Sequence, residues 1–233
     1  MLHAFNHNKS RQFQRYLGVR HDPDERRIAA EDEITSIVMG PLAFLGAPAI
    51  GMFWRNLIQL HHANVDFPAG PPSQASMRFW PRNKGIEPDL HVELCWGPQK
   101  RTVLVEFKWR ARLSTPTQLQ DQWQRYLKPE EQTNGYHLFI GLDKSEALGA
   151  LARDDVWNGR LLACNWFDVM TVLTTLQIPS HDGLSAWGKQ VMDFFALLKV
   201  PTFKGFKSLE AAVHRPEASP LFFTSPQLPR MHP

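Results

Sequence analysis

Cysteine is scarce in this sequence, since its 233 residues include only Cys95 and Cys164. Two cysteines exclude a disulfide framework and a cysteine-rich zinc ribbon, and their scarcity fits a reducing cytoplasm. The sequence also has no P-loop, Rossmann glycine signature, Gly-x-Ser-x-Gly elbow or Cys-x-x-Cys pair. We therefore expect no nucleotide cofactor. The N-terminal residues lack the charged and apolar regions of a signal peptide, so we expect a cytoplasmic protein.

Neither sign of charge is in large excess. The chain has 26 lysines and arginines against 23 aspartates and glutamates, which gives a net charge of +3. With 43% apolar and 21% charged residues, it is not collagen-like, low-complexity or wholly disordered. Its length allows one large domain or one domain with appendages. The mild positive balance suits a polyanionic partner without identifying one.

Long apolar runs are rare, and the nearest to a membrane span is residues 34–54, which contain no charged residue. The run is long enough to cross a bilayer. Glycines and prolines interrupt it, namely Gly40, Pro41, Gly46, Pro48 and Gly51. Because a proline inside a helix costs about 3 kcal/mol, we predict a buried helix, a bend near Pro48 and a second helix through Leu60. This interpretation disfavours the alternative of a membrane-associated protein.

The hydrophobic periodicity predicts a mixed α/β domain over residues 29–200. Its elements follow the order α-β-β-β-α-β-β-α, with an extra C-terminal helix, and the first helix begins near Ala29. The predicted strands are residues 77–80, 88–94, 102–109, 136–142 and 160–165, and the later helices are residues 116–127, 167–176 and 184–199. We expect residues 1–28 to form a basic, irregular arm and residues 201–233 a proline-rich tail.

Two successive predicted strands carry charged residues in a pattern that indicates chemistry. Asp89 follows Pro88 at the start of one strand, and Glu106 and Lys108 lie two residues apart in the next. Side chains two apart in a strand share a face, so pairing of these strands would bring two carboxylates and an ammonium together. Mg²⁺ is usually held by one or two carboxylates and substrate phosphate. A lysine beside them can orient or polarise an attacking water, as metal-assisted phosphodiester hydrolysis requires.

At these residues the sequence resembles the PD-(D/E)XK nuclease superfamily. Pro88-Asp89 and Glu106-Phe107-Lys108 match its signature, and the resemblance covers residues 29–176. It implies a restriction-endonuclease-like fold, a mixed β-sheet flanked by helices. It also implies a helix ahead of the core that adds a glutamate to the metal site. On a helical wheel Glu31 lies about 60° from the centre of the apolar face and Glu33 about 100°, which favours Glu31 and leaves Glu33 as the alternative.

Some branches of this superfamily place a glutamine and a second polar residue on the helix after the signature strand. Here Gln118 and Gln122 are spaced i, i+4 and share one helix face. Gln122 and Tyr126 also form a Gln-x-x-x-Tyr spacing, so the register of this motif stays open. The plain alternative places both glutamines in solvent, because glutamine is a good helix former at exposed positions.

The resemblance implies a Mg²⁺-dependent nuclease that hydrolyses DNA phosphodiester bonds and leaves a 5′-phosphate, with Mn²⁺ able to replace Mg²⁺. The metal ligands would be Asp89, Glu106 and Glu31 or Glu33. Lys108 would position or activate the water, and Gln118 or Gln122 would orient the lysine or contact phosphate. Basic residues in neighbouring segments are candidates for contacts with the DNA backbone: Arg82, Lys84, Arg110 and Arg112. Roles in bacterial antiviral defence or in mobile elements are common in this superfamily.

Other interpretations of the same residues stay open. The chain could be a catalytically silent nuclease-fold subunit that binds nucleic acid or scaffolds a larger complex. Glu106 and Lys108 would then be an exposed ion pair of little energetic value, and Asp89 a turn residue. Cleaving a duplex with one such site implies a homodimer or two successive events. The lack of a separate specificity domain suggests a protein partner or recognition of a nucleic-acid structure. The sequence does not distinguish DNA from RNA, or endonucleolytic from exonucleolytic action.

Overall fold

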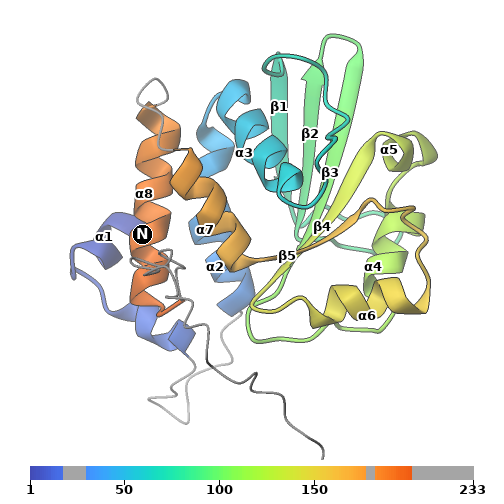
Figure 1. Cartoon of the computed structure of the whole chain (residues 1–233). Coiled ribbons are helices and arrows are strands. Elements are labelled where there is room, and N and C mark those ends of the chain that lie inside the picture. The colour runs from blue at the N-terminus through green and yellow to red at the C-terminus, as the bar shows by residue number, and fades with distance from the viewer. Residues whose placement is uncertain (18–29, 177–181, 201–233) are drawn as a thin grey trace, which may run out of the picture. The chain divides into compact units, whose positions relative to one another are not determined.

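Five strands form one mixed β-sheet in the computed structural model, which describes residues 1–17, 30–176 and 182–200. The strands are β1 (Gln74–Phe79), β2 (Leu90–Trp96), β3 (Gln99–Phe107), β4 (Gly135–Gly141) and β5 (Leu161–Asn165). Their order in the sheet is their order in the chain, as Figure 1 shows. β1, β2 and β3 pair antiparallel, whereas β3, β4 and β5 pair parallel. The predicted α/β class and mixed sheet are therefore confirmed.

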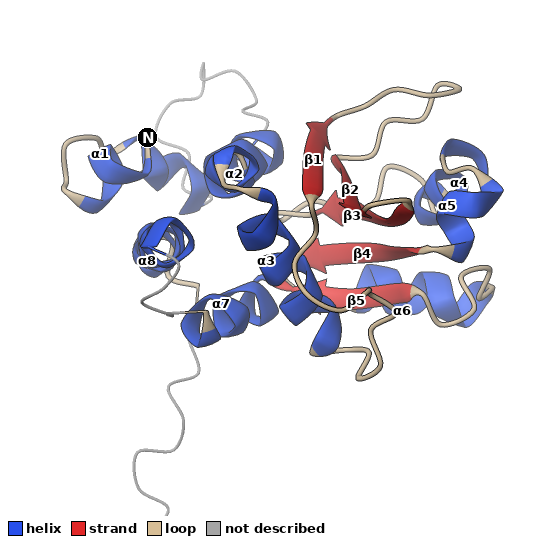
Figure 2. Cartoon of the chain, turned by 90° about the horizontal axis from the view of Figure 1, so that it is seen from above, coloured by secondary structure: helices blue, strands red, loops and turns tan. Residues whose placement is uncertain are grey.

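Helices cover both faces of this sheet. They are α1 (Leu2–Asn6), α2 (Ala30–Met39), α3 (Ala47–Gln59), α4 (Gln118–Asp121), α5 (Pro129–Thr133), α6 (Ser145–Arg153), α7 (Trp166–Thr175) and α8 (Asp182–Leu197), with the 3-10 segments η1 (Gln12–Leu17) and η2 (Pro41–Phe44) and the π-helical turn η3 (Gln122–Tyr126). In Figure 2, α1, α2, α3, α7 and α8 lie on one side of the sheet, and α4, α5 and α6 on the other. Parallel strands need connections that cross a face of the sheet, and the second group of helices supplies them.

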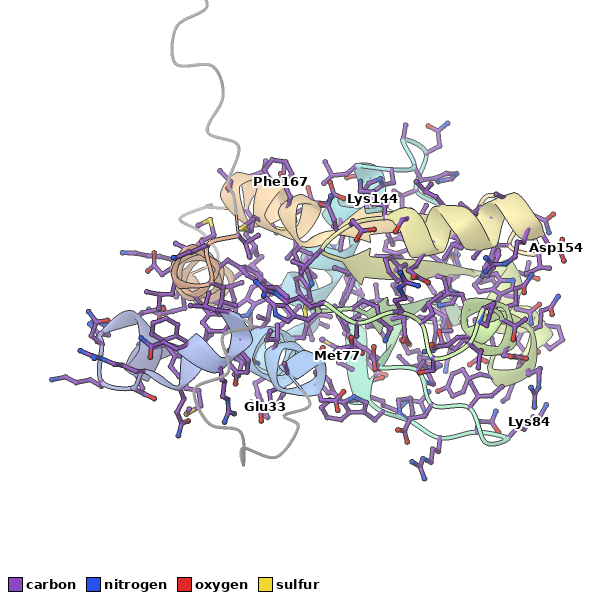
Figure 3. The ribbon with its side chains drawn as sticks, turned by 90° about the horizontal axis from the view of Figure 1, so that it is seen from below. Glu33, Met77, Lys84, Lys144, Asp154 and Phe167 are labelled. Atoms are coloured by element: carbon purple, nitrogen blue, oxygen red, sulfur yellow. The ribbon has the colours of Figure 1, made fainter. Side chains whose placement is uncertain are left out.

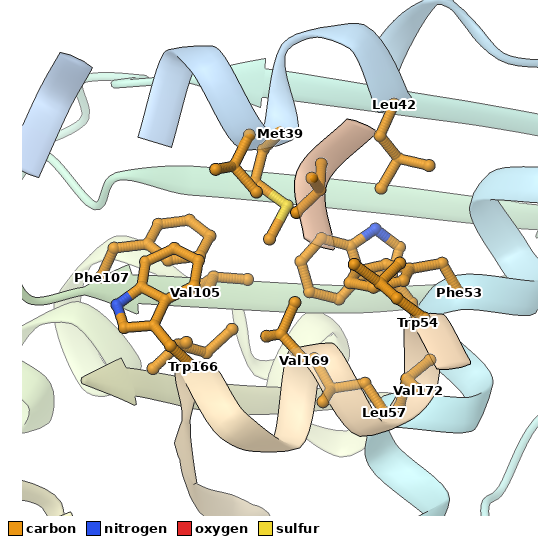
Figure 4. Close-up of a cluster of buried hydrophobic side chains, with 14 of the residues drawn as sticks. Met39, Leu42, Phe53, Trp54, Leu57, Val105, Phe107, Trp166, Val169 and Val172 are labelled. Carbon is orange, nitrogen blue, oxygen red and sulfur yellow. The ribbon is translucent and has the colours of Figure 1, made fainter. Parts of the chain in front are cut away.

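The larger hydrophobic core lies between the sheet and the α2, α3 and α7 side (Figure 4). Val103, Val105 and Phe107 of β3 contribute to it, as expected for a strand with period-2 alternation. Phe107 stacks on Trp166 at the start of α7, with ring centroids 5.3 Å apart. This packing fixes the end of β3, from which the chain continues to Lys108.

A smaller core lies on the opposite face of the sheet, under α4, η3 and α6. Leu104 and Phe139 contribute to it from β3 and β4, together with Leu119 and Trp123. Glu106 belongs to this second face, because it alternates with the residues that enter the larger core. Glu106 therefore takes the face opposite to Val105 and Phe107, as predicted.

The apolar run at residues 34–54 breaks at a different place from the one predicted. α2 ends at Met39, η2 follows, and α3 begins at Ala47, so the break lies at residues 40–46. Pro48 occupies the first turn of α3, where its missing N–H loses no hydrogen bond. Among the described residues, no helix combines the length and the apolar character needed to cross a membrane.

The chain also departs from the predicted order of elements in three places. Residues 2–6 and 12–17 are helical instead of irregular, and they bury Phe5 and Tyr16 within the compact unit Met1–Thr202. α6 separates β4 from β5, because two parallel strands cannot be joined by a tight turn. α5 is a further helix that the prediction lacks. The predicted tail, residues 201–233, lies outside the described residues.

Candidate active site

Asp89 and Glu106 meet at one end of the sheet. Leu90 pairs with Val105 in the register of β2 and β3, so the residues just beyond this pair, Asp89 and Glu106, come opposite each other. Asp89 is 8% exposed, and its Oδ2 accepts a 2.7 Å hydrogen bond from the Phe107 backbone N–H. The structure thus brings the two carboxylates together, as the strand pattern predicts.

Glu106 is the centre of the cluster and is only 1% exposed. Lys108 Nζ lies 2.6 Å from its Oε1. Gln118 Nε2 donates to the same oxygen at 2.5 Å, and Gln122 Nε2 donates to Oε2 at 2.6 Å. Because both oxygens accept hydrogen bonds from these donors, the arrangement suits the ionised carboxylate. Gln118 and Gln122 therefore face the site and not the solvent.

A chain of hydrogen bonds behind Gln122 sets the direction of its amide. Trp157 Nε1 donates to His137 Nδ1 at 3.0 Å, so a neutral His137 carries its proton on Nε2. Nε2 lies 3.1 Å from Gln122 Oε1, which turns the amide nitrogen towards Glu106. Gln122 opens the π-helical turn η3, and such turns are frequent at functional sites. His137 and Trp157 escaped the sequence prediction, because only the fold brings them behind Gln122.

Glu31, in the first turn of α2, is the helix carboxylate that reaches the cluster. Its Oε1 lies 2.6 Å from Lys108 Nζ, and its Oε2 accepts a 3.1 Å hydrogen bond from the Trp109 backbone N–H. Glu33 instead accepts a 2.6 Å hydrogen bond from the Tyr16 hydroxyl. Of the two alternatives open in the sequence, the structure places Glu31 beside Lys108.

Burial and mutual repulsion shift the pKa values in this cluster. Burial, and then the charge of Glu106, raise the pKa of Asp89 to about 8. Burial also raises the pKa of Glu106, although the Lys108 ammonium opposes the shift. Burial alone would lower the pKa of Lys108, but Glu106 and Glu31 outweigh it and raise that pKa. Lys108 is therefore an ammonium at neutral pH, and the surrounding carboxylates favour a further proton or cation.

Three carboxylates at this end of the sheet could hold that cation. Oxygens of Glu31, Asp32 and Asp89 lie within 4.8 Å of one another. Carboxylate oxygens are the ligands that hard divalent cations prefer, so these residues fit Mg²⁺. The group differs from the predicted ligands in containing Asp32 and not Glu106. Asp32 escaped prediction because the resemblance implies a single glutamate on this helix, which singled out Glu31 and Glu33.

His91 and Tyr126 form a second buried contact on the same face of the sheet. His91 Nδ1 lies 2.9 Å from the Tyr126 hydroxyl and 3.2 Å from Arg78 Nη2. Its Nε2 is buried and has no hydrogen-bond partner among the described residues. The Gln-x-x-x-Tyr spacing therefore directs Gln122 to Glu106 and Tyr126 to His91. The alternation of β2, which puts His91 on the face of Asp89, is the sequence signal for this contact.

The four basic residues predicted to contact DNA lie in two segments, Arg82 and Lys84 between β1 and β2, and Arg110 and Arg112 after β3. Arg82 forms an exposed ion pair with Glu87. In Figure 3, Lys84 lies well apart from Lys144, which precedes α6. The chain neighbours of Lys144, Asp143 and Ser145, line a cavity, so Lys84 lies away from it. Arg110 and Arg112, by contrast, line this cavity together with Lys108. The structure therefore brings the second pair, and not the first, to the wall of this cavity.

His61, Cys164 and Asp168 form another group of possible ligands, near the start of α7. Asp168 Oδ2 already accepts hydrogen bonds from Lys144 (2.8 Å), His61 (3.1 Å) and the Asn165 backbone N–H (2.9 Å). The Asp168 backbone N–H in turn donates a 3.0 Å hydrogen bond to Asn165 Oδ1, which completes a capping box for α7. We therefore assign this group a structural role.

Comparison of the chain with protein-family models, with curated proteins and with solved structures found no match. The chemistry of the site is therefore inferred from its own residues and geometry.

Proposed function

We propose that this protein is a metal-dependent nuclease that hydrolyses DNA phosphodiester bonds at the Asp89–Glu106–Lys108 cluster. The observation that carries the proposal is the buried contact of Lys108 with Glu106 and Glu31. Burying charged groups is costly, and apolar residues at such positions are often equally or more stabilising. Carboxylates with strongly shifted pKa values are typical of functional sites. A role in stability alone would therefore explain this cluster poorly.

The order of the elements supports the resemblance to the PD-(D/E)XK superfamily. The helix α2 precedes an antiparallel set of three strands, and a crossover leads from β3 to the parallel strand β4. Pro88-Asp89 and Glu106-Phe107-Lys108 fall at the paired ends of adjacent strands. These features are the ones that a restriction-endonuclease-like fold requires, and we propose that fold for this domain.

Glu31, Asp32 and Asp89 are the residues that would hold the metal, which we propose to be Mg²⁺, with Mn²⁺ as a substitute. When bound, the ion would polarise the phosphate and lower the pKa of an attacking water. The carboxylates converge from two directions, since Glu31 and Asp32 come from α2 and Asp89 directly precedes β2.

Lys108 acts in this proposal as a hydrogen-bond donor. Because Glu106 and Glu31 raise its pKa, its ammonium can orient a water or offset charge on the phosphate, but it cannot remove a proton. Glu106 holds the ammonium in place, and Gln118 and Gln122 hold Glu106. Of the two roles predicted for Lys108, the geometry favours positioning the water over activating it as a base.

A cleavage assay with matched variants tests this function. We expect single- or double-stranded DNA to be cut in Mg²⁺ or Mn²⁺ and not in EDTA. We expect Glu106→Gln and Lys108→Met to slow cutting by about 100-fold or more, because each removes a preorganised charge. Glu93→Gln and Lys100→Met are the controls, since these residues form the same kind of pair, 3.2 Å apart, elsewhere on β2 and β3.

Thermal unfolding of each variant separates lost chemistry from lost folding. Metal-dependent cutting that survives both Glu106→Gln and Lys108→Met would refute the site. Cutting of RNA but not of DNA would show that the substrate is RNA and not the proposed DNA. Binding of nucleic acid without cutting, in any of these metals, would favour a catalytically silent binding subunit.

A further inference from the structure

A cavity of about 320 Å³ opens beside the acidic cluster. Its walls come from the chain just after β3, from the end of β4 and from the first turn of α6, and they include Lys108, Arg110, Arg112, Phe139, Gly141 and Ser145. In α/β proteins, ligands bind beyond the carboxyl ends of parallel strands, and β3 and β4 are such a pair. The volume is at the lower end of the range for small-molecule sites.

Lys108 connects this cavity to the acidic cluster. Its ammonium contacts Glu31 and Glu106, each at 2.6 Å, and the residue also lines the cavity. A group held in the cavity would therefore lie next to the place where the proposed reaction occurs.

The basic side chains of the cavity are available to an anion. Arg112 is exposed and, among the described residues, forms no ion pair with a carboxylate. Arg110 donates one N–H to the Leu17 carbonyl at 2.6 Å. This bond anchors the side chain and leaves its other N–H groups available to a ligand. A guanidinium has five donors in a planar fork that matches the oxygens of a phosphate.

Two acidic residues, Asp143 and Glu146, also line the cavity. Asp143 accepts hydrogen bonds from the Ser145 backbone N–H (2.9 Å) and hydroxyl. These bonds lower the pKa of Asp143 and hold its charge against the first turn of α6. Because the Lys108 ammonium is already paired with Glu31 and Glu106, Arg110 and Arg112 are the basic groups of the cavity wall that can meet an anion.

We infer that this cavity binds a single nucleotide through its phosphomonoester, next to the phosphodiester that is cut. The inference rests on the proposed nuclease function and adds the kind of group that the site holds beside the reacting phosphate. The phosphate would lie against Arg110 and Arg112, and the sugar and base would occupy the remaining volume. Such a pocket would recognise a strand end or a released mononucleotide.

Calorimetric titration of the whole protein in EDTA tests the inference without cleavage. The probes are deoxyadenosine 5′-monophosphate, its 3′-phosphate isomer, deoxyadenosine and inorganic phosphate. We expect a monophosphate to bind and deoxyadenosine not to bind. We expect Arg112→Gln to lower the affinity for the monophosphate about tenfold, because a hydrogen bond to a charged group is lost. Arg153→Gln is the control, since Arg153 is exposed near the end of α6 and does not line the cavity.

The outcomes separate this inference from the proposed function. Cleavage of DNA without any nucleotide binding would overturn the pocket and leave the nuclease function intact. Equal affinity for inorganic phosphate and for the nucleotide would also overturn the inference, because the cavity would then select only an anion. Nucleotide binding that Arg112→Gln weakens and Arg153→Gln does not would support it, even if cleavage were never observed.

Discussion

At the scale of single residues, Glu106 shows how a buried carboxylate is held. Each of its oxygens accepts a hydrogen bond from a glutamine, and the Gln122 amide is oriented by His137. His137 is fully buried and in turn accepts a bond from Trp157. His137 touches neither the metal ligands nor Lys108 in these contacts, so it is a positioning residue that acts through Gln122.

We predict that His137→Leu lowers both stability and activity, whereas His137→Gln restores much of each. Leucine leaves the Trp157 N–H and the Gln122 carbonyl oxygen without partners, which costs about 2 kcal/mol or more. Glutamine can accept and donate one hydrogen bond at the same place. Denaturant unfolding and cleavage rates of the two variants check this. Equal cleavage by His137→Leu and the wild type would contradict the positioning role.

We also predict that the contribution of His137 to stability falls on acidification. Burial lowers the pKa of His137 to about 3, whereas in the unfolded chain it is about 6.5. Between these values the unfolded state binds an extra proton at this residue, so the contribution of His137 to the free energy of unfolding falls as the pH drops from about 6.5 towards 3. Asp89, whose pKa is raised to about 8, contributes in the opposite direction, so the measurement is the difference in unfolding free energy between the wild type and His137→Gln at each pH. A difference that stays constant between pH 6.5 and 3 would contradict the neutral, buried histidine.

At the scale of elements, the connection from β3 to β4 sets the register on which the site depends. Gly135 starts β4 and pairs with Thr102. A Cβ at Gly135 would lie 2.4 Å from the Glu131 carbonyl oxygen and 3.0 Å from that of Thr102. No side chain fits there, so α5 and β4 can meet closely. This junction places His137 opposite Leu104, on the face that carries Glu106.

We predict opposite effects for two glycine-to-alanine changes. Gly135→Ala should lower the free energy of unfolding by about 1–3 kcal/mol, because overpacking against backbone forces a shift. Gly149→Ala, inside α6, should raise it by about 0.5–1 kcal/mol, because alanine favours the helix. The Cβ at Gly149 would lie 3.6 Å from Arg153 Nη1, an ordinary contact. Denaturant titration of both variants measures the effects, and a stabilised Gly135→Ala protein would contradict the tight junction.

At the scale of the whole molecule, the N-terminal residues complete the core beside the site. Phe5 is fully buried and stacks on Phe194 of α8, with ring centroids 5.5 Å apart. The Tyr16 carbonyl accepts a 3.1 Å hydrogen bond from the Trp109 indole N–H. Trp109 directly follows Lys108, so the N-terminal segment braces the chain that carries the lysine.

We predict that Phe5→Ala lowers the free energy of unfolding by about 3–5 kcal/mol, as expected for removing a buried aromatic ring. His3→Ala, at an exposed position of α1, should change it by less than about 0.5 kcal/mol. Hydrogen exchange should show lost protection in α8 for Phe5→Ala and not for His3→Ala. Equal stability of the two variants would show that the N-terminal helix is dispensable.

Features that depend on local periodicity could be predicted from the amino-acid sequence alone. Alternation along β3 separated Glu106 from Val105 and Phe107, because successive side chains of a strand point to opposite faces. The i, i+4 spacing of Gln118 and Gln122 placed both on one helix face, which the structure turns towards Glu106. The α/β class followed from the same patterns. α6 was missed, although the parallel pairing of β4 and β5 requires a crossover.

The side chains that surround those residues could not be predicted in this way. Glu31 and Glu33 both lie in the first turn of α2. Glu31 contacts Lys108, whereas Glu33 accepts a hydrogen bond from Tyr16, which belongs to a segment expected to be irregular. His137 contacts Gln122 because β4, which carries His137, pairs with β3. The chain between these two strands is long, so their pairing brings together residues that are not neighbours in the sequence. Asp32 lies near Asp89 because α2 packs against the sheet end. These contacts join residues far apart in the chain, and no local pattern encodes them, since they depend on how the elements pack.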